Sequence, residues 1–326
     1  MSREARFLAA LRRLAPHPAA RGLADDAAVL EVGGERIVLT HDMLVEGVHF
    51  LPDDPPGDVA AKLLAVNLSD LAAKGAKPLG VLMGYSLRED ADWDQAFAAG
   101  LGEALAAHDV PLLGGDTVSL PADAPRTLGL TALGTCAGAV PSRAGARAGD
   151  ELWVTGTIGD AGAGLRILTG ALQGDAALVE RYRLPTPRLE AGQRLAPLVT
   201  AMMDVSDGLL IDAARMAEAS AAALSINLAR LPLSAALQSA CGSDRPARFA
   251  AATAGDDYEL LFAAAPEQAP VLLALSQELS LPFTRLGAFS PGSGLTLHDG
   301  NTPLPLPERL GWEHGASPVE SGGGGP

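Results

Sequence analysis

Lysine is almost missing from this 326-residue sequence, in which only Lys62, Lys74 and Lys77 occur. None of them lies in a Gly-Lys-Ser/Thr segment, so the sequence contains no P-loop. No Val-Ala-Ile-Lys segment is present either, which excludes the protein-kinase arrangement. Any phosphate group that binds here must therefore be neutralised by arginine or by divalent metal ions.

Positive charge and cysteine are scarce as well. The net charge of −15 argues against nucleic acid or an anionic membrane as a partner, because both need a basic protein surface. Cys136 and Cys241 lie far apart without a Cys-x-x-Cys pair, so we expect two free thiols in a reducing compartment. No signal peptide and no apolar run of membrane-spanning length are visible. We expect a soluble, cytoplasmic protein that binds neither nucleic acid nor membrane.

Aromatic residues make up only 4% of the chain and hydrophobic residues 48%, so alanine, leucine and valine must fill the interior. The length allows two domains with separate cores. A polar, glycine-rich connection at 141–150 marks the predicted boundary between them. We expect an N-terminal domain at 1–140, a C-terminal domain at 141–318 and a flexible tail at 319–326.

Alternating apolar segments predict an α+β layer in the N-terminal half, with helices on one face of a sheet. The predicted strands there are 27–32, 36–45, 78–87, 110–120 and 127–138, and the predicted helices are 4–15, 60–78 and 92–107. Gly114 to Asp116 is predicted to form a sharp bend that exposes backbone N–H groups. In the C-terminal half, strands are predicted at 151–156, 201–204, 282–289 and 294–300 and after Asp257, with a helix at 266–279.

The helix predicted at 60–78 consists almost wholly of leucine, alanine and valine. Asn67, Asp70 and Lys74 are three and four residues apart and share one face of it. One interpretation is an exposed stripe with an Asp70–Lys74 ion pair. The other is a buried helix in which Asp70 faces a metal site.

The second interpretation gains weight because the same arrangement recurs. An aspartate ends or interrupts an apolar segment at five positions, Asp26, Asp42, Asp70, Asp116 and Asp204. Buried carboxylates repel one another and take up protons unless a cation binds them. Aspartates without a His or Cys cluster suit Mg²⁺ rather than zinc. Mg²⁺ with few lysines is typical of phosphoryl transfer, but composition names neither the donor nor the acceptor.

Short motifs occur in a distinctive order along the chain. They are Gly22-Leu23-Ala24-Asp25-Asp26, Thr40-His41-Asp42-Met43-Leu44-Val45-Glu46-Gly47-Val48-His49-Phe50, Val66-Asn67-Leu68-Ser69-Asp70-Leu71-Ala72-Ala73, Gly114-Gly115-Asp116-Thr117, Val154-Thr155-Gly156, Asp204-Val205-Ser206-Asp207-Gly208-Leu209 and Asp257-Tyr258-Glu259-Leu260. Together they closely resemble the thiamine-monophosphate kinase family of the aminoimidazole ribonucleotide synthetase superfamily. The resemblance extends from residue 22 to Trp312.

The resemblance implies ATP-dependent phosphorylation of thiamine monophosphate to thiamine diphosphate, by direct in-line transfer with several Mg²⁺ ions. It implies an N-terminal domain that binds ATP and metal, and a homodimer in which the N-terminal mixed sheets join into a barrel-like core. The C-terminal domain is implied to be an α/β domain of the aminoimidazole ribonucleotide synthetase type. The site should lie in the cleft between the two domains.

The family's functional residues can be carried over position by position. The resemblance implies metal ligands at Asp26, Thr40, His41 (through its backbone carbonyl), Asp42, Asp70, Asp116, Asp204 and Asp207. It implies ATP contacts at Gly115, Asp116, Arg143 and Ser206, and substrate contacts at His49, Asp256 and Trp312. The residues expected to support catalysis directly are Asp42, Asp70, Asp116 and Asp204.

Simpler roles stay open for some of these positions. His49 could be a hydrogen-bonded core imidazole, Trp312 a core aromatic docked at the surface, and Ser206 or Asp207 a helix N-cap. The sequence also departs from the family at Lys74, where an apolar residue is common, so that Lys74 could compete for Asp70. Asp256 stands where the family has glutamate and is one methylene shorter.

Two other functions compete with the kinase. One is another ATP-using enzyme of the same superfamily, acting on a ribonucleotide, selenide or a carbamoyl group. The selenide enzyme would need a reactive cysteine near the N-terminus, and no cysteine precedes Cys136. The other is a non-catalytic protein that binds Mg-nucleotide or thiamine phosphate.

Overall fold

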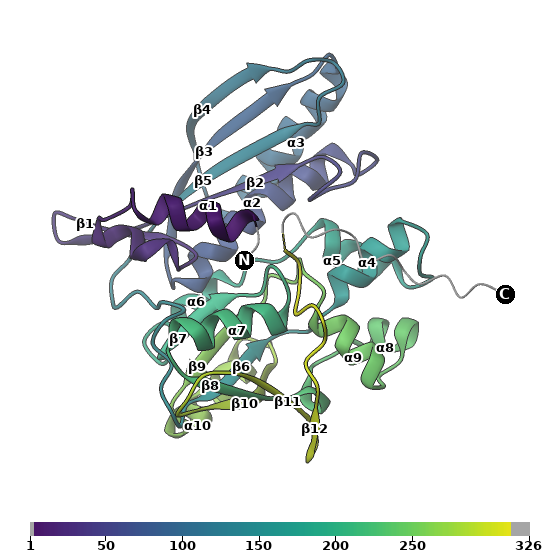
Figure 1. Cartoon of the computed structure of the whole chain (residues 1–326). Coiled ribbons are helices and arrows are strands. Elements are labelled where there is room, and N and C mark those ends of the chain that lie inside the picture. The colour runs from purple at the N-terminus through teal and green to yellow at the C-terminus, as the bar shows by residue number, and fades with distance from the viewer. Residues whose placement is uncertain (1–2, 314–326) are drawn as a thin grey trace.

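The computed structural model describes residues 3–313, which fold around two separate β-sheets (Figure 1). The N-terminal sheet has the strand order β1-β2-β5-β3-β4, with β3 and β4 parallel and the other neighbours antiparallel. It is therefore mixed, as predicted. The elements of this half are α1 (Arg3–Arg12), the 3-10 helix η1 (Pro18–Leu23), β1 (Ala28–Val32), β2 (Glu35–Val45), α2 (Pro56–Ala73), β3 (Lys77–Leu87), α3 (Ala91–His108), β4 (Leu112–Ser119) and β5 (Thr127–Cys136).

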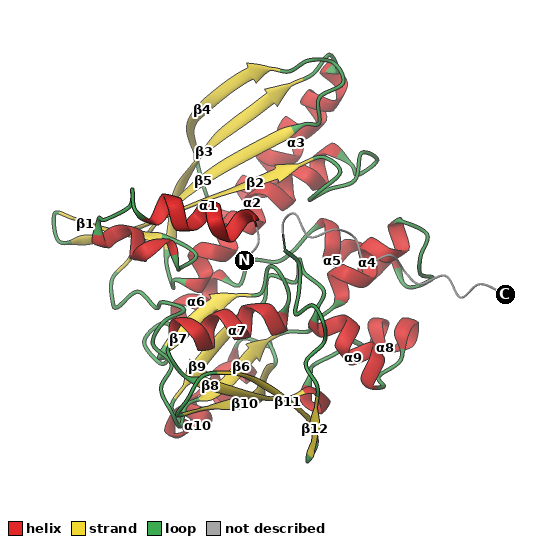
Figure 2. Cartoon of the chain, viewed as in Figure 1, coloured by secondary structure: helices red, strands yellow, loops and turns green. Residues whose placement is uncertain are grey.

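The N-terminal sheet buries one face against α2 and α3, which confirms the predicted layer (Figure 2). From Leu130 to Cys136 of β5, buried and half-buried residues alternate, because successive side chains of a strand point to opposite faces. The face turned away from α2 is apolar but exposed. Met43, Leu82 and Val118 lie on it with 48%, 41% and 53% of their surface accessible.

The bend predicted at Gly114 to Asp116 is wrong, because β4 continues through these residues as a strand. Gly115 has a φ of +158°, and a Cβ at this position would lie 1.9 Å from the Met83 carbonyl oxygen. The glycine is thus needed for close approach to β3 rather than for a turn. All residues of β4 are solvent-exposed, and β4 is an edge of the sheet.

The C-terminal sheet has seven strands in the order β12-β11-β8-β10-β6-β9-β7. Its strands are β6 (Glu151–Thr155), β7 (Ala201–Asp204), β8 (Ala223–Asn227), β9 (Leu260–Ala264), β10 (Phe283–Ser290), β11 (Gly294–Asp299) and β12 (Thr302–Leu304). Its helices are α4 (Asp160–Leu168), α5 (Ala176–Arg183), α6 (Leu189–Leu195), α7 (Leu209–Ala219), α8 (Ala235–Cys241), α9 (Arg245–Ala252) and α10 (Ala269–Glu278), with 3-10 turns η2 (Leu228–Arg230) and η3 (Pro266–Gln268). β6, β7 and β9 are buried along their whole length, since helices cover both faces.

Helix α2 joins the two halves of the molecule. Most of it packs in the core of the N-terminal sheet, but Ala72 and Ala73 belong to the core around α6, α10 and the C-terminal sheet. The helix ends at Gly75, whose φ of +61° suits glycine, and a Cβ there would lie 2.4 Å from the Ala196 side chain. The last turns of α2 are therefore held between the two domains.

Several other expectations can be compared with the described residues. Cys136 and Cys241 are free thiols, as expected. Within 3–313, no helix combines the length and the apolar character needed to cross a membrane. The separate tail predicted at 319–326 lies outside the described residues, and the boundary at 140 stays a prediction.

Candidate metal and phosphate site between the domains

The polar face of α2 is buried. Asn67 and Lys74 are fully inaccessible and Asp70 is 8% exposed. The exposed stripe is therefore the wrong interpretation of this helix. Asn67 uses both ends of its amide: Nδ2 donates to the Leu63 carbonyl at 2.9 Å, and Oδ1 accepts the backbone N–H of Asp42 at 2.9 Å. Asn67 thereby ties β2 to α2 at the level of Asp70.

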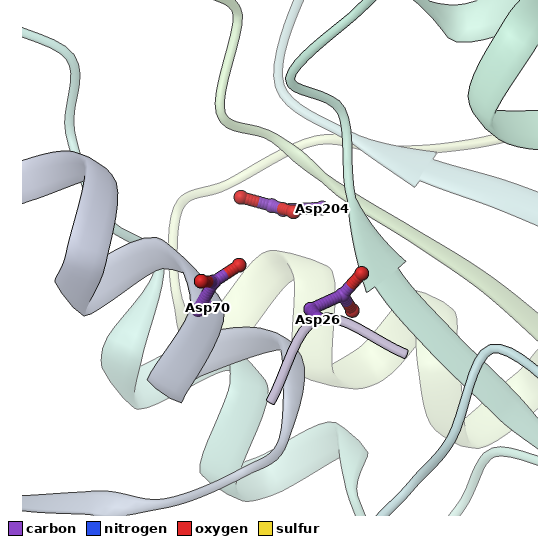
Figure 3. Close-up of side chains that lie close together, drawn as sticks. All are labelled: Asp26, Asp70 and Asp204. Atoms are coloured by element: carbon purple, nitrogen blue, oxygen red, sulfur yellow. The ribbon is translucent and has the colours of Figure 1, made fainter. Parts of the chain in front are cut away.

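Asp26, Asp70 and Asp204 converge at the junction of the two domains (Figure 3). Each offers a carboxylate oxygen, and these oxygens all lie within 4.8 Å of one another. Asp26 comes from the segment before β1, Asp70 from α2, and Asp204 from the end of β7. Residues far apart in the sequence thus form one acidic centre that includes both domains.

Hydroxyl groups hold two of these carboxylates. The Thr40 hydroxyl, on the buried face of β2, donates to Asp70. The Ser69 hydroxyl donates to Asp204 Oδ2 at 2.5 Å, across the domain junction. Both donors are themselves buried, so the two carboxylates are held in place without any bound ligand.

Two cations, Lys74 and Arg143, lie on the side of Asp26. Arg143 donates from Nη2 to Asp26 Oδ1. The Lys74 ammonium donates to Asp25 Oδ1 at 2.5 Å and lies 2.7 Å from Asp26 Oδ2. Lys74 therefore pairs with Asp25 and Asp26, and the predicted competition for Asp70 is wrong. Burial alone would raise the pKa of Asp25, but Lys74 and Arg21 outweigh it and lower that pKa to about 2.

Burial and mutual repulsion raise the pKa of Asp42, Asp70 and Asp204. Burial raises the pKa of Asp70 well above its usual value, and Asp42, Asp204 and Asp26 add to the effect. Burial, together with Asp26, raises the pKa of Asp204 to about 8. Burial also raises the pKa of Asp42. Acidic groups in this state are stabilised as anions by a nearby positive ion.

The donor set suits Mg²⁺. Asp26 Oδ2 is buried and has no hydrogen-bond donor among the described residues, although the Lys74 ammonium lies beside it. Three carboxylates packed together, two of them with a raised pKa, are an arrangement that a divalent cation relieves. All three groups are hard oxygen ligands, which magnesium prefers. The residues present therefore fit the predicted metal.

Asp42 and His41 lie on the same strand but on opposite faces of the sheet. Asp42 alternates with the buried residues Thr40 and Leu44, on the face toward α2. The His41 side chain is exposed on the other face, where Nδ1 lies 2.9 Å from Thr131 Oγ1. His41 can serve the centre only through its backbone, which is the role that the resemblance implied.

Asp116 is not brought to the centre within one chain. Asp116 pairs with Gly84 of β3, and Gly84 pairs with Gly129 of β5. Gly129 in turn pairs with Met43 of β2. Asp116 is thus on the exposed face, opposite Asp42, and three strands away from it, about 14 Å at the usual spacing. Gly115 lies on the same edge strand. The metal and ATP contacts predicted for these two residues stay predictions.

Ser206 and Asp207 lie in the loop between Asp204 and α7, and neither caps the helix. Helix α7 has Gly208 at its N-cap and no side-chain cap. Instead, the backbone N–H groups of Ser206 and Asp207 donate to Asp212 Oδ2 at 3.1 and 3.0 Å. Arg215 pairs with Asp207 at 2.5 Å and with Asp212 at 2.9 Å. This network orients the loop next to Asp204.

Two of the three predicted substrate residues, His49 and Asp256, meet around Lys62, a residue of α2 that is 2% exposed. Its ammonium donates to the His49 carbonyl at 3.0 Å and to Asp256 Oδ2 at 2.9 Å, and it lies 3.9 Å from the centre of the Tyr182 ring. His49 belongs to the N-terminal half, whereas Asp256 and Tyr182 belong to the C-terminal half. Asp256 has a φ of +68°, in the left-handed region that few non-glycine residues adopt.

The side chain of His49 is also engaged, since its Nδ1 accepts the backbone N–H of Val45 at 3.0 Å. Trp312 is 53% exposed, and its backbone N–H donates to the Asp207 carbonyl at 2.8 Å. The indole is thus held at the rim of the loop that follows Asp204. It is not a core aromatic, and its predicted substrate contact stays a prediction.

Sequence reasoning missed several residues of this site. Asp25 was visible in the Asp25-Asp26 pair, but nothing marked it as the partner of a lysine 49 positions later. Ser69 precedes Asp70 in a recognised motif, yet it serves Asp204 instead. Lys62 and Asp212 carried no signal beyond being charged residues in apolar helices, which is a pattern that can be searched for.

Comparison with known proteins places this arrangement in a family. The model of the AIR synthase related protein N-terminal domain matches residues 24–136, and that of the C-terminal domain matches residues 147–300. The chain is 39% identical over 307 residues to the thiamine-monophosphate kinase of Caulobacter vibrioides, covering 91% of this chain and 86% of that protein. It is 38% identical over 305 residues to that of Escherichia coli K12, covering 91% and 92%.

Solved structures of thiamine-monophosphate kinases are also similar to this chain. The crystal structure of thiamine-monophosphate kinase from Stenotrophomonas maltophilia is 40% identical, with a TM-score of 0.75, and the match covers 88% of this chain and 93% of that chain. The complex of AaThiL with AMPPCP and TMP is 29% identical, with a TM-score of 0.82, and covers 94% and 96%.

Proposed function

Because the chain belongs to the AIR synthase related proteins and, among them, to the thiamine-monophosphate kinase family, we propose that it transfers the γ-phosphoryl group of ATP in line to thiamine monophosphate. A single observation carries the proposal beyond family membership. Asp26, Asp70 and Asp204 converge from both domains into one buried oxygen set. The relative AaThiL has been solved with AMPPCP and TMP, which supports ATP and thiamine monophosphate as the two substrates here.

Asp26, Asp70 and Asp204 would hold Mg²⁺, with Asp42, Thr40, the His41 carbonyl and Asp207 available at the margin of the cluster. When bound, Mg²⁺ would offset the negative charge of the two phosphate groups that must approach each other. Thr40 and Ser69 hold Asp70 and Asp204 in position beforehand, so little reorganisation is needed.

The reaction depends on the alignment of the two substrates more than on proton transfer. The attacking oxygen of thiamine monophosphate is already negatively charged, so no strong general base is required. Arg143 can present its remaining N–H groups to a phosphate while it pairs with Asp26, since a guanidinium has five donors in a planar fork. Ser206, in the loop after Asp204, would contact the same nucleotide.

The substrate would bind on the side of His49, Asp256 and Trp312. Trp312 offers an exposed aromatic face, which can stack on the cationic thiazolium or the pyrimidine. Lys62 fixes Asp256 and the His49 carbonyl relative to each other across the domain junction. Its position supports a substrate site that requires both domains in one arrangement.

We propose that the active form is a homodimer with a barrel-like core. β1 pairs only with Glu35 to Leu39 of β2, so the rest of that strand has no strand partner on this side among the described residues, although side chains accept the Asp42 and Val45 N–H groups there. β4 is the other edge of the sheet. Pairing the β4 edge of one copy with this part of β2 in a second copy would close the two sheets around their exposed apolar faces. It would also bring Asp116 of one copy beside the strand that carries Asp42 in the other.

The deciding experiment is incubation of the purified protein with ATP, Mg²⁺ and thiamine monophosphate, followed by separation of the thiamine phosphates. Formation of thiamine diphosphate with matching ADP supports the proposal. Binding of both substrates without product would indicate a non-catalytic binding protein. ATP turnover that thiamine monophosphate does not increase would favour another enzyme of the superfamily. A cytoplasmic location suits a reaction that consumes ATP.

A further inference from the structure

Lys74 is a fully buried cation within the acidic centre, one turn after Asp70 at the end of α2. Its ammonium has three oxygen neighbours: Asp25 Oδ1 at 2.5 Å, Asp26 Oδ2 at 2.7 Å and the Met202 carbonyl at 3.2 Å. An ammonium group has three N–H donors and is strongly hydrated in water. Burying it is costly unless anions surround it, and here they do.

The placement of these oxygens is asymmetric. Asp25 receives a true hydrogen bond from Lys74, together with a second ion pair from Arg21 at 2.5 Å. Asp26 Oδ2 faces Lys74 at ion-pair distance but receives no hydrogen bond. Asp26 is thus neutralised by the ammonium at Oδ2 and by Arg143 at Oδ1, while one of its oxygens lies within 4.8 Å of those of Asp70 and Asp204.

We propose that Lys74 is a permanent, protein-borne cation of the metal centre, which takes the place of a divalent ion on the Asp25 side of Asp26. The inference rests on the proposed function only in so far as Asp26, Asp70 and Asp204 bind metal. A divalent ion on that side would meet the ammonium charge at short range, and the two repel. With a neutral residue at position 74, Asp25 Oδ1 and Asp26 Oδ2 would lose their shared cation and could bind a further ion, while Arg21 and Arg143 still hold the other two oxygens.

A purely structural role makes a different prediction. Lys74 also donates to Met202 of β7, so it could serve only to attach α2 to the C-terminal sheet. In that case its removal would lower stability but leave metal binding unchanged in number and affinity. Metal binding measured without substrates therefore separates the two roles.

The test compares Lys74→Met and Lys74→Gln with the wild type and with Lys77→Met, which removes an exposed lysine three residues later. Mn²⁺ binding to the full chain is measured by equilibrium dialysis without nucleotide. We expect both position-74 variants to bind one more ion per chain, or to bind Mn²⁺ roughly tenfold more tightly, because a repelling unit charge has been removed. Lys77→Met should match the wild type.

Thermal unfolding in EDTA and in Mg²⁺ gives an independent readout. Removing Lys74 should lower the metal-free melting temperature and increase the stabilisation by Mg²⁺ beyond that of the wild type. Should a variant fold only with metal, purification in Mn²⁺ and elemental analysis still give the count. Unchanged number and affinity in both variants would overturn the role of Lys74, whereas a wild type that forms no thiamine diphosphate would count against the proposed function instead.

Discussion

Replacing Asp204 with asparagine should stabilise the metal-free protein near pH 8. Burial and Asp26 raise the pKa of Asp204 from 3.8 to about 8 in the folded chain. A carboxyl with a raised folded pKa contributes stability that is fully present below its unfolded pKa and is lost as the pH rises through the folded value. Such a group loses at most about 1.4 kcal/mol of unfolding free energy per pH unit, so about 2 kcal/mol should disappear between pH 6 and pH 8. Asparagine has no proton to lose, and its carbonyl can still accept the Ser69 hydrogen bond.

The measurement is urea unfolding followed by circular dichroism, at pH 6 and pH 8, first in EDTA and then with excess Mg²⁺. The wild type should lose about 2 kcal/mol more than Asp204→Asn over this interval in EDTA. Excess Mg²⁺ should restore the wild type at pH 8 and do much less for the variant, because a neutral amide is a weaker ligand. Asp123→Asn, at an exposed position, serves as the control. The reasoning fails if both proteins show the same pH dependence, or if Mg²⁺ stabilises them equally.

Three further outcomes are expected. Lys62→Met should raise KM for thiamine monophosphate roughly tenfold and leave KM for ATP unchanged, since the substitution releases Asp256 from its ion pair. Equal rises in the two KM values would point to a general loss of structure. Arg143→Lys should raise KM for ATP about tenfold, because a point charge replaces a planar fork, and an unchanged value would remove Arg143 from the nucleotide site. Asp70→Asn and Asp116→Asn should each abolish turnover while the fold survives. If Asp116 acts across the dimer, mixing and refolding these two variants should restore about a quarter of wild-type activity. The reason is that random pairing leaves one intact site of two in half of the dimers. No recovery would place Asp116 in the site of its own chain.

Much of the local structure is predictable because it depends on short-range pattern. The alternation in β2 and β5 and the apolar run of α2 identify these elements. Short elements with mixed composition escaped prediction, namely β8, α5, α8 and α9. The bend at Gly114 to Asp116 was mispredicted because glycines suit a turn as well as a close strand contact, and only the Met83 backbone on β3 distinguishes the two.

The site residues, too, could be predicted only in part. That aspartates at the ends of apolar segments bind a cation could be argued from their chemistry, and Asp26, Asp70 and Asp204 do converge. Asp42 lies on the same buried face, but Asp116 does not. Which face of a mixed sheet a residue occupies depends on strand order and register, and these are non-local properties.

By itself, the sequence determined the order of motifs, the oxygen-rich and lysine-poor chemistry of the site, and the apolar character of α2, because composition and periodicity act through neighbours along the chain. Only the tertiary structure determined which charged groups form ion pairs. Lys74 had Asp70 within one helical turn, yet it pairs with Asp25 and Asp26, which reach it from the segment before β1. In a buried site the energy of a charge depends on which groups packing brings within a few ångströms, and sequence distance does not measure that.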